Sequence, residues 1–63
     1  MSSLVAALKS ITNREVAVWL THIEFKVLAG RLTEVQDEHL VLRVADNVYY
    51  IPYHAIVAVR PNA

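Results

Sequence analysis

The sequence contains no cysteine, so neither a disulfide nor a thiolate zinc site can stabilise this chain of 63 residues. It has one glycine, which excludes the glycine-rich loops that cradle phosphate groups. It has no surplus of either charge, because six basic residues balance six acidic ones. Dedicated nucleic-acid-binding proteins usually carry a basic surplus, since phosphate contacts dominate their affinity. The composition therefore argues against nucleotide binding and gives no overall support to nucleic-acid binding.

Patterns that would direct the chain to a membrane are also missing. The apolar runs are far too short to span a bilayer, so we expect no membrane partner. The N-terminus lacks the basic stretch followed by an apolar stretch that is typical of a secretion signal. We therefore expect a cytoplasmic protein with one domain over residues 1–63.

Catalytic and metal-binding patterns are not found in the sequence either. No serine or threonine stands in a motif with a base and an orienting acid. Asp37, Glu38 and His39 are consecutive, and neighbours on a strand point to opposite faces, so their spacing does not build a shared site. The histidines form only an irregular set, which consists of His22, His39 and His54. We expect no enzyme activity, no cofactor and no bound metal.

Hydrophobic residues are what the sequence has in abundance. They make up 56% of the chain and give a mean hydropathy of +0.36. A barrel of this size cannot bury so much apolar surface inside itself, and association between copies would bury the surplus. The composition therefore predicts a homo-oligomer.

The first part of the chain has a helical pattern, and the rest has the pattern of strands. Leu4, Leu8 and Ile11 recur at spacings of four and three residues, which predicts a short amphipathic helix over residues 3–11. Such a short helix is unstable alone and must pack on the rest of the protein. From Arg14 onward, alternating apolar residues indicate strands. The predicted strands are residues 14–20, 21–35, 39–44, 48–51 and 56–60, separated by turns at 36–38, 45–47 and 53–55.

The second predicted strand changes phase near its middle, beside Gly30. A phase change next to a glycine indicates a bulge or a sharp bend. A small sheet with such a bend closes into a barrel of the SH3 type, which removes most exposed edges. The expected fold is therefore mainly β, a five-stranded SH3-type barrel with a short N-terminal α-helix. The alternating residues are Ile23, Phe25, Val27 and Ala29 before the change, and Leu32 and Val35 after it.

Turn chemistry adds two details. The turn at 45–47 contains Asp46 and Asn47, which are residue types suited to a positive φ angle. Pro52 ends the fourth strand, because proline has no N–H to donate to a neighbouring strand.

Four patterns follow one another along the chain: the short helix, the bent strand carrying AGRL, the HLVL strand, and the closing HAIVAV. Their order resembles the Sm-like superfamily, which includes bacterial Hfq, over essentially the whole chain. The resemblance is nearest to small uncharacterised bacterial Sm-like proteins that carry Y-I-P before I-V-x-V-x-P. It implies a ring, often a hexamer or heptamer, in which the fourth strand of one subunit pairs with the fifth strand of the next. The interface residues that it implies are Val48, Tyr49, Tyr50, Ile51, Ile56, Val57 and Val59.

The resemblance also implies where RNA would bind. Asp37 stands where RNA-binding Sm proteins carry an aspartate, with His39 close by, and Tyr53 and His54 stand at the turn that faces the pore. Two parts of the family pattern are missing. No asparagine accompanies the aspartate, and Tyr53 occupies the place of a lysine in Hfq. A tyrosine can stack on a base but supplies no cation.

Each aromatic candidate also has a structural interpretation. Tyr53 and His54 form either a ligand-binding pair repeated around a pore, or a turn that packs on a neighbouring subunit, with His54 bonded to the backbone. Tyr49 and Tyr50 point to opposite faces, so one belongs to the core and the other to the surface or an interface. Trp19 either anchors a partner or covers the N-terminal helix, and we favour the helix because it must dock somewhere.

The sequence thus favours a non-enzymatic, ring-forming Sm-like protein with RNA as its candidate ligand. The alternative is a structural or protein-interaction module that does not bind nucleic acid. A third interpretation is a monomeric barrel that docks on a larger protein partner.

Overall fold

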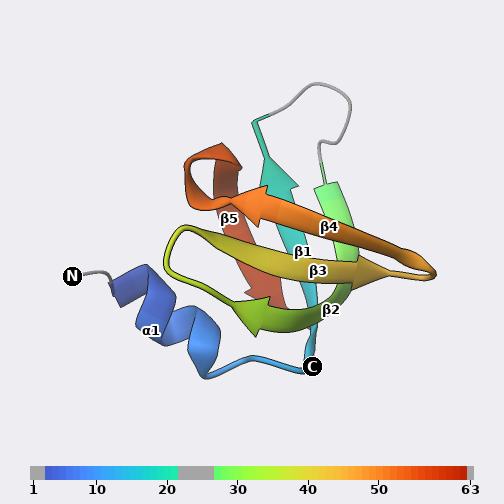
Figure 1. Cartoon of the computed structure of the whole chain (residues 1–63), viewed down its shortest axis with the longest axis horizontal. Helices are drawn as coiled ribbons and strands as arrows, with labels where there is room; N and C mark the ends of the chain where they lie inside the picture. The colour runs from blue at the N-terminus through green and yellow to red at the C-terminus, as the bar shows by residue number, and fades with distance from the viewer. Residues whose placement is uncertain (1–2, 22–26, 63) are drawn as a thin grey trace.

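The computed structural model describes residues 3–21 and 27–62, and it shows a short helix followed by five antiparallel strands (Figure 1). The mainly β fold with an N-terminal helix is therefore confirmed. Within the described part of the chain, no helix is long and apolar enough to cross a membrane. The elements are α1 (Ser3–Lys9), β1 (Glu15–Leu20), β2 (Val27–Val35), β3 (His39–Val44), β4 (Asn47–Pro52), a 3₁₀ helix (Tyr53–Ala55) and β5 (Ile56–Pro61).

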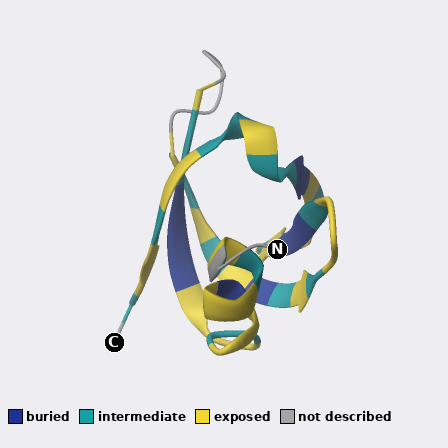
Figure 2. Cartoon of the chain, turned by 90° about the vertical axis from the view of Figure 1, so that its left-hand side faces the viewer, coloured by how far each residue is buried: buried dark blue, intermediate teal, exposed yellow. Residues whose placement is uncertain are grey.

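The strands form one curved sheet in the order β4-β3-β2-β1-β5. Strands β1 to β4 pair in sequence, and β5 then returns to pair with β1. Because the sheet curves, β3 and β4 pass in front of β1 and β5 (Figure 1), and α1 lies at the opening between the two sides (Figure 2). The last two strands of the chain are thus the two edges of the sheet, and the 3₁₀ helix joins them.

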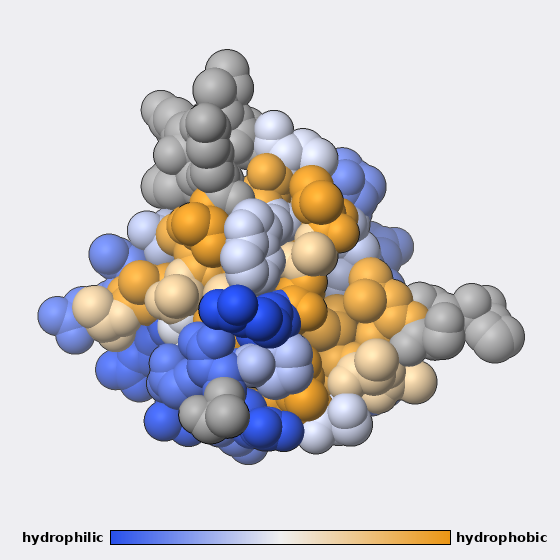
Figure 3. Space-filling model, turned by 180° about the vertical axis from the view of Figure 1, so that it is seen from behind, coloured by the Kyte–Doolittle hydropathy of each residue, from blue (hydrophilic) through white to orange (hydrophobic). Residues whose placement is uncertain are grey.

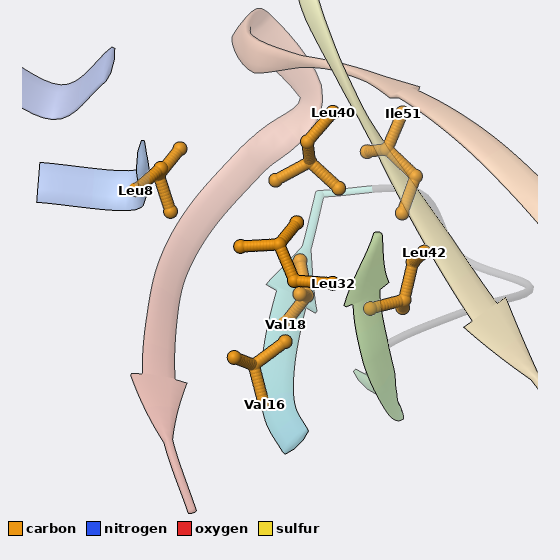
Figure 4. Close-up of a cluster of buried hydrophobic side chains, with 7 residues drawn as sticks. All are labelled: Leu8, Val16, Val18, Leu32, Leu40, Leu42 and Ile51. Carbon is orange, nitrogen blue, oxygen red and sulfur yellow. The ribbon is translucent and has the colours of Figure 1, made fainter. Parts of the chain in front are cut away.

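The core lies on the concave side of this sheet. Val16 and Val18 of β1 are fully buried, and Ala17 between them is only 5% exposed. A buried leucine or valine stabilises the fold by about 1.5–3 kcal/mol relative to an exposed one, so this cluster supplies a large share of the stability. The cluster takes one residue from α1 and the others from β1, β2, β3 and β4 (Figure 4). Its members are Leu8, Val16, Val18, Leu32, Leu40, Leu42 and Ile51.

Helix α1 ends at Lys9, two residues before the predicted end at residue 11. The Ser10 hydroxyl donates a hydrogen bond to the carbonyl of Ala7 at 2.6 Å, and such local bonds compete with a continuing helix. Asn13 then takes a φ angle of 71°, a left-handed conformation that asparagine tolerates better than most residues. The helix is therefore present as predicted but shorter, and the chain turns directly into β1.

The phase of β2 differs from the prediction. Val27 and Ala29 are exposed, whereas Leu28 between them packs against the core. The cause is the register, which places Ala29 opposite Ala17 on the convex face of the sheet. Periodicity along β2 alone does not show this, because both sets of alternating residues are apolar. Two further residues of the predicted pattern, Ile23 and Phe25, lie outside the described residues.

The backbone of β3 passes very close to Gly30 in β2. A Cβ atom at this position would overlap the carbonyl oxygen of Arg43 and lie 2.9 Å from the side chain of Val44. Its φ angle is not positive, so glycine is needed here for space and not for a special backbone conformation. The pairing of β2 with β3 then shifts register between Leu32 and Glu34. The predicted irregularity is thus present in β2, but it lies after Leu32 and not beside the glycine.

The turn between β3 and β4 takes its positive φ angle at an unexpected residue. Ala45 has a φ of 55°, whereas Asn47 already pairs with Val44 as the first residue of β4. The expectation that Asp46 or Asn47 would take this conformation is wrong, because the turn is one residue shorter than predicted and its positive φ angle falls on its first residue. A left-handed conformation costs a residue with a side chain about 1–2 kcal/mol, so this turn holds a small strain.

We expect Gly30→Ala to lower the free energy of unfolding by about 3 kcal/mol, since overpacking typically costs this much at its upper end. Urea denaturation followed by circular dichroism measures the change. The neighbouring exposed variant Ala29→Ser is the control and should change the free energy by less than about 0.5 kcal/mol. Equal stability of Gly30→Ala and the wild-type protein would contradict the close approach.

Candidate functional site

The 3₁₀ helix that joins the two edge strands is tied to the turn between β2 and β3. The Tyr53 hydroxyl donates a hydrogen bond to the carbonyl of Gln36. The backbone N–H of Tyr53 donates to the carbonyl of Glu38 at 3.2 Å. Two bonds from one residue therefore hold this turn, and they bring Tyr53 next to Asp37, its partner in the predicted RNA site.

The environment of Tyr53 is that of a structural residue. Burial raises the pKa of its hydroxyl, and the negative charge of Asp37 raises it further. The hydroxyl therefore stays neutral and keeps its proton for Gln36. The side chain is half-buried and packs against the core cluster. These contacts lie within one chain and already use both the ring and the hydroxyl.

The two histidines of the predicted RNA site take no part in these hydrogen bonds of Tyr53. His39 is opposite Pro52 in the pairing of β3 with β4, and its ring centroid lies 5.8 Å from that of Tyr50, with the ring planes at 56°. His54 is exposed on the 3₁₀ helix, and its side chain has no hydrogen-bond partner among the described residues. Over the same residues, no group of three or more His, Cys, Asp or Glu side chains could hold a metal ion.

Both edge strands carry exposed apolar side chains. In β4, Val48 is 51% exposed and Tyr50 is 70% exposed, and in β5, Val57 is 66% exposed. Tyr49 points the other way from Tyr50 and packs against the core, as predicted. The exposed set covers three of the seven predicted interface residues. The side chains of the other four, Tyr49, Ile51, Ile56 and Val59, belong to or pack against the core.

Ile51 differs most from its predicted place. It is only 6% exposed and is a member of the core cluster. Strand β4 turns one face inward, and Ile51 is on that face opposite Leu40. Its side chain therefore cannot be an interface contact, although its backbone still belongs to the edge strand.

A β-bulge explains the exposure of Val57. In the pairing of β1 with β5, Leu20 is opposite Ile56 and Trp19 is opposite Ala58, so Val57 is an extra residue. The bulge interrupts the alternation of β5 and turns this valine outward. No feature of the sequence IVAVR marks the bulge, because every neighbouring residue is also apolar.

Trp19 does not cover the helix, so the interpretation favoured from the sequence is wrong. The helix buries Leu8 among Val16 and Val18 on the concave side of the sheet, and Trp19 alternates with these valines onto the convex side. There the guanidinium of Arg60 lies 5.4 Å from the centre of the Trp19 ring. Sequence reasoning missed Arg60 as the partner of Trp19, because the two strands pair only after β5 has returned to β1.

We expect Tyr53→Phe to lower the free energy of unfolding by about 1 kcal/mol, since it leaves the Gln36 carbonyl without its hydrogen bond. Tyr50→Phe is the matched control, because the Tyr50 side chain is 70% exposed and its hydroxyl has no partner among the described residues. Urea denaturation of both variants checks the difference.

The raised pKa of Tyr53 also predicts how stability depends on pH. Its contribution to stability should be complete below pH about 10, the unfolded value, and be lost as the pH rises through the folded pKa. Tyr53→Phe should flatten this alkaline loss of stability, and an unchanged loss would contradict the assignment.

Comparisons with known proteins place the chain in a family. No curated protein matches it. One family model, described as Domain of unknown function (DUF2642), matches residues 3–61. The match runs from the start of α1 to the end of β5, so it includes every element of the fold and both edge strands. The chain belongs to the DUF2642 family.

Proposed function

We propose that this domain is a non-enzymatic assembly module whose copies join edge to edge, with β4 of one copy beside β5 of the next. One observation carries the proposal: both edge strands present large apolar side chains to solvent. Val48 and Tyr50 do so on β4, and Val57 does so on β5. The function proposed is therefore the formation of a homo-oligomeric ring by a domain of the Sm-like type.

Edge strands need a partner for a physical reason. A strand at the edge of a sheet has one row of backbone N–H and C=O groups that faces no neighbour within the sheet. Among the described residues, β4 pairs only with β3, and β5 pairs only with β1. A contact between two different edges is heterologous, so it leaves one free edge at each end of a growing chain of subunits. Closure into a ring satisfies all the edges.

The arrangement of the elements supports the Sm-like part of the proposal. A short N-terminal helix, an irregular second strand that carries the glycine, and last strands at opposite edges agree with the order that the resemblance implies. Ring sizes of six or seven subunits belong to the same proposal. The cytoplasm is the compartment that we propose, because the fold needs no disulfide.

Light scattering tests the assembly. We expect the wild-type protein at micromolar concentration to have several times the mass of one chain. The double variant Val48→Lys/Val57→Lys should no longer form the ring and should have a lower mass than the wild-type protein, because the added charges cannot be buried between paired edges. Leu4→Lys is the control, since Leu4 is 43% exposed and belongs to α1 and not to either edge strand. A wild-type protein that stays monomeric at this concentration would contradict the proposed assembly.

RNA binding is the second candidate function, and one observation favours it. His39 and Tyr50 form a tilted aromatic pair on the surface of β3 and β4, and exposed aromatic rings are platforms for stacking bases. Tyr53 is a weaker candidate than the sequence indicated, because its hydroxyl is bonded to Gln36 and its side chain packs against the core. The balance of charge, six basic against six acidic residues, limits the affinity of any such contact.

Fluorescently labelled oligo-U and oligo-A test this candidate at low ionic strength. If RNA is the ligand, binding should weaken with added salt, and Tyr50→Ala should weaken it about tenfold, as expected for the loss of one stacked base. Light scattering on the same variant separates loss of stacking from loss of assembly. The absence of binding by the wild-type protein would leave only the structural or protein-interaction function.

A further inference from the structure

A second apolar surface lies away from both edges, on the convex face of β1 and its neighbours. Trp19 is at its centre, opposite Val27 on one side and Ala58 on the other. Ala17 lies next along β1 and is paired with Ala29. Figure 3 shows the molecule from behind, with apolar side chains spread over this side and strongly hydrophilic ones crossing the middle. We define the convex face by Trp19, Val27, Ala29, Ala58 and Arg60; Ala17 is buried and is not part of it.

Arg60 gives this face an unbalanced positive charge. Its guanidinium lies over the Trp19 ring at 5.4 Å, where the contact orients it and leaves its N–H groups available at the rim. The other arginine nearby, Arg31, is already paired with Glu15 at 3.6 Å. Within the part of the chain that the structure describes, no carboxylate forms an ion pair with Arg60. The convex face therefore fits a partner that brings both an acidic group and apolar surface.

The same chain carries a surface with these properties at the turn between β2 and β3. Asp37 and Glu38 are exposed there, and neither has a cationic partner among the described residues. The turn has a fixed shape because Tyr53 bonds to Gln36 and Glu38. Pro52 is half-exposed beside it and adds apolar surface. We define this surface, Gln36 to His39 with Pro52, as the acidic turn.

The two surfaces do not pair within one chain. Tyr53 holds the acidic turn, whereas Arg60 lies four residues beyond Ile56 in β5, roughly 13 Å along that strand at about 3.3 Å per residue. Among the described residues Arg60 forms no ion pair with Asp37 or Glu38, so we assign the pairing of these charges to a contact between copies. The chain has equal numbers of acidic and basic residues, and every copy carries both Arg60 and the acidic turn.

We propose that the convex face of one copy binds the acidic turn of a second copy, with Arg60 against Asp37 and Glu38, and Trp19 against the apolar side of the turn. This contact goes beyond the pairing of edge strands, since it uses neither the free edge of β4 nor that of β5. Each copy offers both surfaces at once, so the contact is heterologous and joins one oligomer to the next.

Charge reversal tests the contact without relying on the edges. All proteins carry Val48→Lys/Val57→Lys, so that an association seen here does not depend on edge pairing. We expect Arg60→Glu alone and Asp37→Arg/Glu38→Arg alone each to weaken self-association about tenfold or more, as charge complementarity across an interface predicts. Mixing these two variants should restore the association, because each then supplies what the other lacks. Lys9→Glu makes the same change in net charge as Arg60→Glu, on the helix, and should have no effect.

The single tryptophan provides a direct measurement. We expect the emission of Trp19 to shift to shorter wavelength as concentration rises, and to become several-fold less accessible to iodide. Added salt should reverse both changes, since the contact depends on charge. This part of the test needs no substitution in the convex face itself. Analytical ultracentrifugation of the same samples gives the masses.

Three results would overturn the proposal. The first is Trp19 emission that is independent of concentration and salt. The second is self-association unaffected by Arg60→Glu, and the third is loss of association in both reversed variants without recovery on mixing. Failure of the edge proposal gives a different pattern, in which Val48→Lys/Val57→Lys leaves the mass of the assembly unchanged while the charge reversals reduce it.

Discussion

The close approach of the β3 backbone to Gly30 is the constraint on which the rest of this structure depends. Gly30 has no Cβ atom, so the paired strands β2 and β3 can approach each other here more closely than a residue with a side chain would allow. The sheet is curved, with β3 and β4 in front of β1 and β5 (Figure 1). A flat sheet of the same strands would leave Leu32, Leu40 and Leu42 without a concave side to fill.

The curved sheet also gives the domain a concave side, two edges and a convex face, and these differ in their properties. The concave side is filled by the core cluster and closed by Leu8 of α1. The two edges carry apolar side chains with polar backbone groups beside them, which suits strand pairing. The convex face and the acidic turn carry opposite charges on rigid supports, the Trp19 ring for Arg60 and the Tyr53 hydrogen bonds for the turn. A chain with no net charge can therefore still have strongly directional contacts.

Local periodicity was enough to predict much of this fold from the sequence. The helix, the burial of Val16 and Val18, the third strand at His39–Val44 and the turn at Tyr53 all depend on residues close together in the chain. The features that were missed depend on register between strands that are distant in sequence. The phase of β2, the bulge at Val57 and the pairing of Arg60 with Trp19 follow from which residues stand opposite each other, and an apolar sequence leaves that choice open.

The candidate site, too, was predictable only where it depends on residues close together in the chain. The neighbourhood of Tyr53 and Asp37 was implied only by the family resemblance, because nothing between residues 37 and 53 shows that two turns meet. The orientation of Tyr49 and Tyr50 followed from strand geometry and holds in the structure. Ile51 was misplaced because the sequence gives the edge strand but not which of its faces the core needs.

The hydrogen bond between Tyr53 and Gln36 has a geometric consequence beyond stability. With the backbone bond from Tyr53 to Glu38, it fixes the connection between β4 and β5 against the turn between β2 and β3. In any edge-to-edge assembly, the angle between neighbouring subunits would then depend on how Tyr53 positions the two edge strands within each chain.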